Sequence, residues 1–313
     1  MNRKKIIIAL TLLILMGIII GEFFCRLYLG LGDPLLTVKH PTIEYMNAPS
    51  TSGSRFGNHY SFNTYGMRSD EIPSEKQDGT LRMLVMGDSI VHASGHVDQS
   101  ELTTTILQRQ LAQNTDHLKV EVYNIAASSW GPPNLLAYTK EFGTFNADIS
   151  IIVLNQVDLY DHPSFGPLNP KSHITEKPLS ALWEFTTRYL YYKIFGDADP
   201  TNYLGSKPIP NRSTSLEIIE LINTLKQANI KVALFYHPTI DEVEGDTHPA
   251  LQQFKQLAHE HDILFADAFQ TYRSAHKSGH KIYRDTIHHN AYGQKVMAQE
   301  IEKLVLQLSA TSN

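Results

Sequence analysis

The sequence predicts an α/β protein in which a mostly parallel sheet lies between two layers of helices, preceded by one N-terminal transmembrane helix. From residue 81 onward, short apolar runs alternate with amphipathic segments of helical length. This alternation is typical of a parallel sheet that is covered on both faces. A separate apolar run near the N-terminus predicts the transmembrane helix.

Five segments are predicted strands, because each is a short, largely apolar run that ends at turn or polar residues. They read "RMLVMG", "LKVEVYNIA", "ADISIIVLN", "IKVALFY" and "ILFAD" (82–87, 118–126, 147–155, 230–236 and 263–267). Helices are expected between and after them, over 100–113, 132–145, 215–229, 249–262 and 290–309. Ser100 is a candidate N-cap for the first of these helices.

The N-terminus begins with three cations in "MNRKK", followed by "IIIALTLLILMGIII", which carries no charge. This pattern predicts a signal anchor whose N-terminus stays in the cytoplasm. The helix can lengthen beyond this run if Glu22 and Arg26, one turn apart, pair with each other. No small-x-small cleavage site follows, although a cleaved signal peptide remains the alternative. Under either interpretation the globular part is extracytoplasmic.

We therefore expect a cytoplasmic tip and anchor over 1–32 and a linker with an irregular lead-in over 33–78. A domain follows over 79–313, interrupted by a proline-rich and aromatic insertion at about 160–213. The net charge of −5 and the pI near 6.3 argue against a nucleic-acid partner. The single cysteine, Cys25, excludes an internal disulfide and a cysteine-based zinc site.

A serine directly follows the first predicted strand, in Gly87-Asp88-Ser89. A serine on a tight turn after a buried strand can expose its hydroxyl and keep its own N–H available, as a nucleophile requires. The alternative is that Ser89 only caps a helix. The carboxyl ends of parallel strands form one rim of the sheet, so we expect Ser129, Asn155 and His237 on the same rim.

A serine nucleophile needs a base, and "YRDTIHHNAYG" before the last helix provides a candidate. Asp285 and His288 are separated by two residues in this segment, so one turn can direct both side chains at the rim. His289 and His280 are competing candidates for the base.

These two motifs together resemble the first and last blocks of the SGNH (GDSL-type) hydrolases. "VYNIAASSWGPPN" and "ISIIVLNQVDLYD" are similar to the second and third blocks of that family, and "FNTYGMRSDEIP" is similar to a lead-in of its membrane-anchored members. The resemblance covers roughly residues 60–158 and 214–309. It implies a three-layer SGNH/flavodoxin-like fold and an esterase mechanism with Ser89 as nucleophile, His288 as base and Asp285 as its orienting carboxylate.

The resemblance also implies an oxyanion hole made by the N–H of Ser89, a second-block glycine N–H and a third-block asparagine. Here Ser129 stands at the glycine position, and its N–H can serve only if the serine adopts the loop conformation. Gly131 is the alternative after a local shift. The third block reads Val153-Leu154-Asn155-Gln156, so Asn155 is the preferred amide. A shift of register to Val157-Asp158 would leave no asparagine there.

The predicted function is a membrane-anchored serine esterase without a cofactor or metal, acting on an O-acyl ester such as an O-acetyl group on an envelope polysaccharide. One alternative is an O-acetyltransferase with the same triad. Another is a non-catalytic envelope protein that binds a polysaccharide or a partner. His92 and His96, four residues apart, lack an evident third metal ligand. The aromatic segment 182–195 is a candidate lid or membrane-facing patch, or packs the insertion onto the domain.

Overall fold

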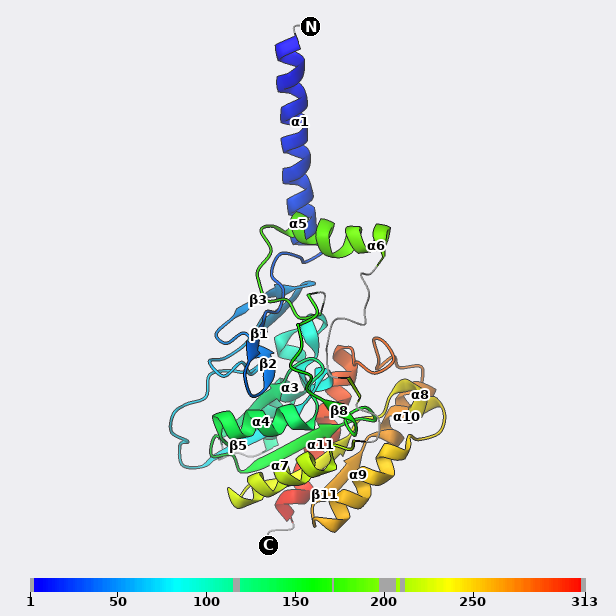
Figure 1. The fold of residues 1–313 in the computed structure, drawn as a ribbon. Helices are drawn as coiled ribbons and strands as arrows, with labels where there is room; N and C mark the ends of the chain where they lie inside the picture. The colour runs from blue at the N-terminus through cyan, green and yellow to red at the C-terminus, as the bar shows by residue number, and fades with distance from the viewer. Residues whose placement is uncertain (1–2, 115–118, 171, 197–206, 209–211, 311–313) are drawn as a thin grey trace.

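A computed structural model describes residues 3–114, 119–170, 172–196, 207–208 and 212–310 (Figure 1). Its centre is a five-stranded sheet in the order β11-β10-β7-β5-β6, and all of the strand pairs in it are parallel. The strands are β5 (Thr80–Gly87), β6 (Lys119–Ala126), β7 (Ile149–Leu154), β10 (Lys231–Tyr236) and β11 (Leu264–Asp267). All five correspond to predicted strands, which confirms the predicted fold class.

Helices cover both faces of this sheet and complete three layers. One face packs against α4 (Pro132–Phe142), α7 (Ser215–Gln227) and α9 (Pro249–Glu260). The other packs against α3 (Thr103–Asn114), α10 (Phe269–Lys277) and α11 (Ala291–Ala310). Successive strand residues point to opposite faces. Accordingly, Leu84 and Met86 join the first core and Met83 and Val85 the second.

The strand order places the first strand of the sheet, β5, between the second, β6, and the third, β7. This is the flavodoxin-like order, in which ligands bind beyond the carboxyl ends of the strands where the chain changes direction across the sheet. Ser89 follows β5 at that point, and Ser129, Asn155 and His237 follow β6, β7 and β10. Two short helices also begin on this rim, α2 (Ser89–His92) and α8 (Ile240–Glu244).

The lead-in differs from the irregular linker that the sequence predicts. It forms two hairpins, β1 (Thr37–His40) with β2 (Glu44–Asn47) and β3 (Ser52–Arg55) with β4 (Asn58–Ser61). These strands of four residues are too short to show a clear alternation of apolar and polar side chains. The lead-in is held against the domain by the buried Arg68, which donates to the carbonyl oxygens of His92 at 2.9 Å and Val97 at 2.7 Å.

Ser100 does not cap α3, which begins three residues later at Thr103. Ser100 instead lies in a 3-10 turn, Gln99–Glu101, in which the Asp98 side chain accepts the Ser100 N–H at 3.0 Å. A second 3-10 turn, Ser94–His96, follows α2.

The N-terminal helix α1 (Arg3–Phe23) extends away from the domain and continues into a π-helical segment, Phe24–Tyr28. Together they form a 26-residue apolar helix that is long enough to cross a membrane. The insertion contributes the strands β8 (Asp161–His162) and β9 (Lys207–Pro208). It also forms a continuous helical stretch, α5 (Ala181–Glu184), a π-helical segment (Phe185–Leu190) and α6 (Tyr191–Phe195), that lies across the base of α1 (Figure 1).

Candidate active site

The structure brings Ser89, His288 and Asp285 together although they are far apart in the chain. His288 Nε2 lies 2.9 Å from Ser89 Oγ. On the other side of the ring, His288 Nδ1 lies 2.9 Å from each carboxylate oxygen of Asp285. When Nδ1 donates to the carboxylate, Nε2 is left as the acceptor for the serine hydroxyl, which is the tautomer that a general base requires.

Ser89 is presented by the sharp turn between β5 and α2. Asp88 caps α2, because its carboxylate accepts the Ile90 N–H at 2.8 Å. Gly87 has no room for a side chain: a Cβ there would lie 2.6 Å from a methyl carbon of Val91. The glycine thus allows the buried strand to turn directly into the helix that Ser89 begins.

Asp285 is held as a carboxylate by the loop around it. Partial burial alone would raise its pKa, but hydrogen bonds from the backbone N–H groups of His288 and Ile287, and from the His288 ring, lower the pKa to about 2. The two backbone bonds measure 2.8 Å and 3.1 Å. Arg284 adds a further contact at 3.0 Å. The group that orients His288 is therefore ionised throughout the neutral range.

Asn155 lies fully buried at the carboxyl end of β7, beside the nucleophile turn. Its amide nitrogen donates to Asp88 at 3.0 Å, and its amide oxygen accepts the Val157 N–H at 2.9 Å. Asp158 turns back and accepts the Asn155 N–H at 2.6 Å. The amide at the end of this strand is therefore Asn155. The bond to Asp88 uses one of the two N–H groups of the amide.

Ser129 adopts the backbone conformation that a glycine would normally take, with φ at +59°. This left-handed region is unfavourable for residues with a Cβ atom. Ser129 thus has a backbone conformation that glycine adopts without strain. The N–H of Gly131, the alternative donor, is directed elsewhere, since it donates to Asn134 Oδ1 at 3.0 Å.

The loop over 127–131, which we call the oxyanion loop, is braced by a residue that the sequence analysis did not single out. Tyr45, on strand β2 of the lead-in, donates from its hydroxyl to the carbonyl oxygens of Ser128 at 2.7 Å and Ser129 at 3.0 Å. Its own carbonyl accepts the indole N–H of Trp130 at 2.9 Å. No short motif marks Tyr45, because its role depends on a tertiary contact between the lead-in and the sheet.

The competing histidines lie elsewhere. His280 stacks on Tyr292 with ring centroids 5.5 Å apart. His289 is buried and packs on His237 with centroids 4.5 Å apart. Burial is the main cause that lowers the pKa of His289 well below its ordinary value and the pKa of His237 to about 4. Both rings are therefore neutral at pH 7.

His237 follows β10 as expected, but it is fully buried. Its side chain therefore does not line an open crevice at the rim. Its Nε2 lies 2.9 Å from the carbonyl oxygen of Ile287, the residue before the catalytic-base candidate His288. His237 thus holds the loop that carries His288, and this role could not be read from the sequence.

His92 and His96 do not share a helix, because α2 ends at His92 and the next residue, Ala93, is left-handed with φ at +58°. Their rings stack on different partners, Phe62 and Phe56. Among the residues that the structure describes, no group of three or more His, Cys, Asp or Glu side chains is placed to hold a metal ion.

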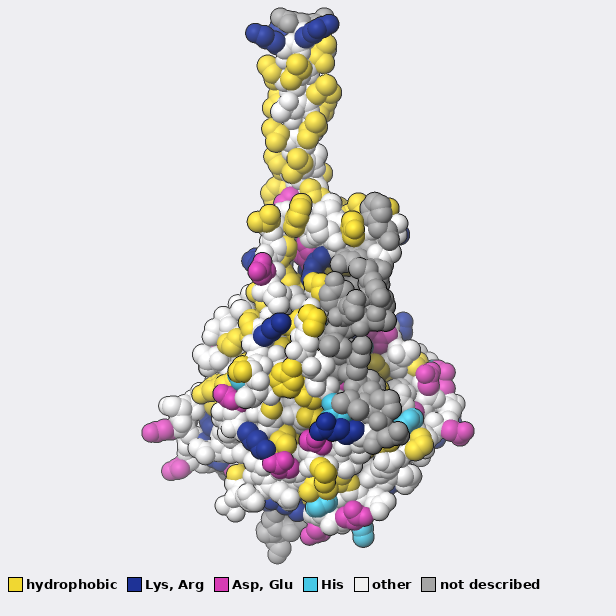
Figure 2. Space-filling view, viewed as in Figure 1, with side chains coloured by type: hydrophobic (Ala, Val, Ile, Leu, Met, Phe, Trp, Pro, Cys, Tyr) yellow, Lys and Arg dark blue, Asp and Glu magenta, His cyan; other side chains and the backbone are white. Residues whose placement is uncertain are grey.

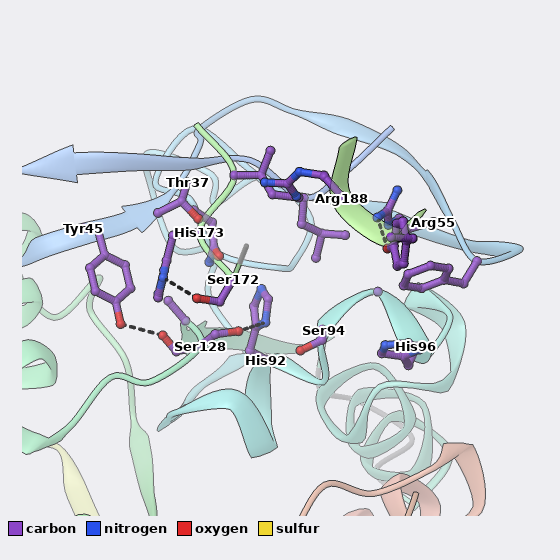
Figure 3. A pocket seen from close by; sticks show the side chains of 17 residues that line it. Thr37, Tyr45, Arg55, His92, Ser94, His96, Ser128, Ser172, His173 and Arg188 are labelled. Carbon is purple, nitrogen blue, oxygen red and sulfur yellow. Dashed lines mark hydrogen bonds between the residues drawn. The ribbon is translucent and has the colours of Figure 1, made fainter. Parts of the chain in front are cut away.

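A cavity of about 220 Å³ adjoins these elements (Figure 3). The cavity is lined by His92 of α2, the helix that begins at Ser89, and by Ser128 of the oxyanion loop. The hairpins of the lead-in and the insertion close its other sides. In Figure 3 the His92 ring rises into this space, and its buried Nε2 has no hydrogen-bond partner among the described residues. Burial lowers the pKa of His92 to about 3, so the ring is neutral.

No protein-family model matches the chain, and a search of curated proteins also found no match. Similar solved structures include an acetyl xylan esterase, at 15% identity and a TM-score of 0.45, over 72% of this chain and 100% of that chain. A lipolytic protein of the G-D-S-L family from Veillonella parvula has 15% identity and a TM-score of 0.43, over 72% and 99%.

A third similar structure is a two-domain esterase active on acetylated mannans. It has 10% identity and a TM-score of 0.48, over 74% of this chain and 50% of that chain. At these values the likenesses carry no inference about the activity of this protein.

Proposed function

We propose that this protein is a membrane-anchored serine esterase that removes an O-acyl group, most simply an O-acetyl group, from an envelope polysaccharide. The observation that carries the proposal is the continuous relay from Ser89 Oγ through His288 to Asp285, with 2.9 Å at each step. A serine that only caps a helix has no need of an oriented imidazole at its hydroxyl.

In the first step Ser89 Oγ attacks the ester carbonyl carbon while His288 Nε2 takes the hydroxyl proton. Asp285 stabilises the imidazolium that forms. When the tetrahedral intermediate collapses, the bond from the carbonyl carbon to the alcohol oxygen breaks and His288 returns the proton to that oxygen. Water then attacks the acyl-serine by the same route and releases the carboxylic acid and Ser89.

The negative charge on the carbonyl oxygen would be stabilised by three donors: the N–H of Ser89, the N–H of Ser129 and the second amide N–H of Asn155. The left-handed conformation of Ser129 supports this role, because it is one that glycine, the residue of the family's second block, adopts readily. The bond from Asn155 to Asp88 supports it too, because it holds the amide beside the nucleophile turn.

The cavity that His92 and Ser128 line supports a carbohydrate as the alcohol part of the ester. Its lining is rich in hydroxyl groups and aromatic rings, and it also carries the guanidinium groups of Arg55 and Arg188. The hydroxyl-bearing and aromatic members of the lining are Thr37, Tyr45, Phe56, Ser94, Ser128, Ser172 and Tyr189. Hydroxyl and imidazole groups can both donate to and accept from sugar hydroxyls.

The anchor is the helix Arg3–Tyr28. At 1.5 Å per residue its 26 residues extend about 39 Å, which exceeds a hydrocarbon core of about 30 Å. The cations at its start favour a cytoplasmic N-terminus and a catalytic domain on the opposite side of the membrane.

The test is acetate release from an O-acetylated xylan or mannan oligosaccharide by the full-length protein in detergent, compared with Ser89→Ala. We expect release by the wild type and none above background by the variant. Mass spectrometry of the same reaction with an unacetylated oligosaccharide acceptor separates hydrolysis from acetyl transfer. Equal release by both proteins would refute the proposal.

A further inference from the structure

The helical stretch Ala181–Phe195 of the insertion, which we call the foot helix, is fastened to the base of α1 (Figure 1). The Glu22 carboxylate accepts the first free N–H groups of the foot helix, from Ala181 at 3.1 Å and Leu182 at 2.8 Å. Gly21 allows the close approach, since a Cβ there would lie 3.3 Å from the Leu182 side chain. The anchor therefore adds to the N-terminal cap of the foot helix, in which the Ser180 hydroxyl accepts the Trp183 N–H at 3.0 Å.

The opposite side of the foot helix is fastened to the catalytic domain. Glu184, fully buried, makes a two-pronged ion pair with Arg55 of β3 at 2.6 Å and 2.9 Å. The same carboxylate accepts the Gly32 N–H at 2.7 Å. The foot helix thus connects the anchor to the domain through two sets of charge-assisted hydrogen bonds.

The outward face of the foot helix is apolar, the reverse of a helix on a water-soluble domain. Trp183, Leu190 and Ile194 along it are 54%, 41% and 62% exposed. Tyr191 is 54% exposed, and Leu179, just before the helix, is 90% exposed. Of the charged residues of this helix, Glu184 faces the protein, whereas Lys193, next to Ile194, is exposed.

This apolar face continues onto the last turns of the anchor, where four large side chains are more than half exposed (Figure 2). They are Phe23, Phe24, Leu27 and Tyr28. The position of the foot helix along α1 also fits a location at the membrane surface. From Lys5 to Glu22 the helix rises about 25 Å, close to the hydrocarbon thickness of about 30 Å. The foot helix therefore meets α1 where the opposite membrane surface is expected.

We propose that the foot helix is an interfacial membrane helix, which lies in the outer surface of the phospholipid bilayer with Trp183, Leu190 and Ile194 inserted at the boundary between headgroups and acyl chains. Exposed Trp and Tyr side chains are typical of that boundary, as are helices with one apolar face lying parallel to it. The domain would then be held at a set height above the bilayer rather than tethered on a free stalk. The inference rests on the retained anchor of the proposed function, but not on the esterase activity.

The two tryptophans make a direct test possible, because Trp130 is buried at 2% exposure and only Trp183 is exposed. The full-length protein is placed in phosphatidylcholine nanodiscs, with lipids brominated near the headgroup end of the acyl chain, near the terminal methyl, or not at all. We expect loss of tryptophan emission with bromine, most strongly at the shallow position. The loss should be absent in Trp183→Phe, where only Trp130 emits.

The tryptophan emission of Ser89→Ala should be quenched as strongly as that of the wild type. Failure of the esterase proposal would therefore not change the expected quenching. Ile194→Glu keeps the reporter and places a charge at the boundary, and it should reduce the quenching. The proposal is overturned if bromine does not change the Trp183 emission. This includes the case where the emission is blue-shifted but unquenched, because a second protein copy then covers the face. Mass spectrometry of the intact chain confirms that the anchor is present in each sample.

Discussion

The backbone conformation of Ser129 leads to a prediction that can be worked out from the structure. With φ at +59°, a residue that carries a Cβ pays about 1–2 kcal/mol relative to a right-handed conformation. Glycine removes this cost but loses about 0.5–1 kcal/mol of chain entropy on folding. Ser129→Gly should therefore leave the oxyanion donor in place and raise the free energy of unfolding by up to about 1.5 kcal/mol.

Ser129→Val has the opposite effect, because a β-branched residue is a genuine outlier at positive φ. The loop should then move to relieve the strain and withdraw its N–H from the oxyanion. Loss of one such donor lowers the rate by about 10²–10³-fold. Ser129→Ala is the matched control, since it keeps the Cβ and removes only the hydroxyl, and it should stay within a few-fold of the wild type.

The assay is kcat/KM for p-nitrophenyl acetate, with thermal melting of each variant to confirm that it is folded. The reasoning is refuted if Ser129→Val hydrolyses the ester at the wild-type rate while folded. It is equally refuted if Ser129→Gly is more than tenfold slower than the wild type.

Three further perturbations test the supports of the site. Tyr45→Phe removes the hydroxyl that braces the oxyanion loop, and kcat should fall about 3–10-fold, since a hydrogen bond contributes about 0.5–1.5 kcal/mol, with KM little changed. Asp285→Asn should lower kcat by up to about 10⁴-fold because it favours the wrong tautomer of His288. Because the folded pKa of Asp285, about 2, lies below its unfolded value of about 3.9, its ionised form stabilises the fold above about pH 4. Urea unfolding should therefore show the stability advantage of wild type over Asp285→Asn shrinking as the pH falls from 4 towards 2, and a constant difference would contradict the assignment. Arg55→Met leaves Glu184 buried without its partner and should cost about 3–5 kcal/mol, most of which Arg55→Met/Glu184→Leu should recover in the same unfolding assay.

The sheet and the contacts among Ser89, His288 and Asp285 could be predicted because their signals are local. Each strand is a continuous apolar run, and the motifs around Ser89 and His288 lie directly beyond a strand and before a helix. Because the carboxyl ends of parallel strands share one rim, the two motifs could be predicted to lie close together. The spacing of Asp285 and His288 is within one turn, so their contact also follows from local geometry.

The supports of the site could not be predicted, because they depend on tertiary contacts. Tyr45 lies in a hairpin of four-residue strands without readable periodicity, and its partners are carbonyl groups of the oxyanion loop. His237 lies at the rim as expected, but the aromatic cluster that buries it and its bond to the loop of His288 could not be predicted. The foot helix has its apolar face outward, so its pattern alone fits a lid, a packed helix or a membrane contact equally well.

The central claim is that Ser89 is a nucleophile activated by His288. It is tested most directly by labelling the full-length protein with a fluorophosphonate probe and mapping the modified peptide by mass spectrometry. The account predicts a stoichiometric adduct on Ser89, no adduct in Ser89→Ala and greatly slowed labelling in His288→Ala. A folded wild-type protein that does not react, or that reacts at another residue independently of Ser89, would contradict it.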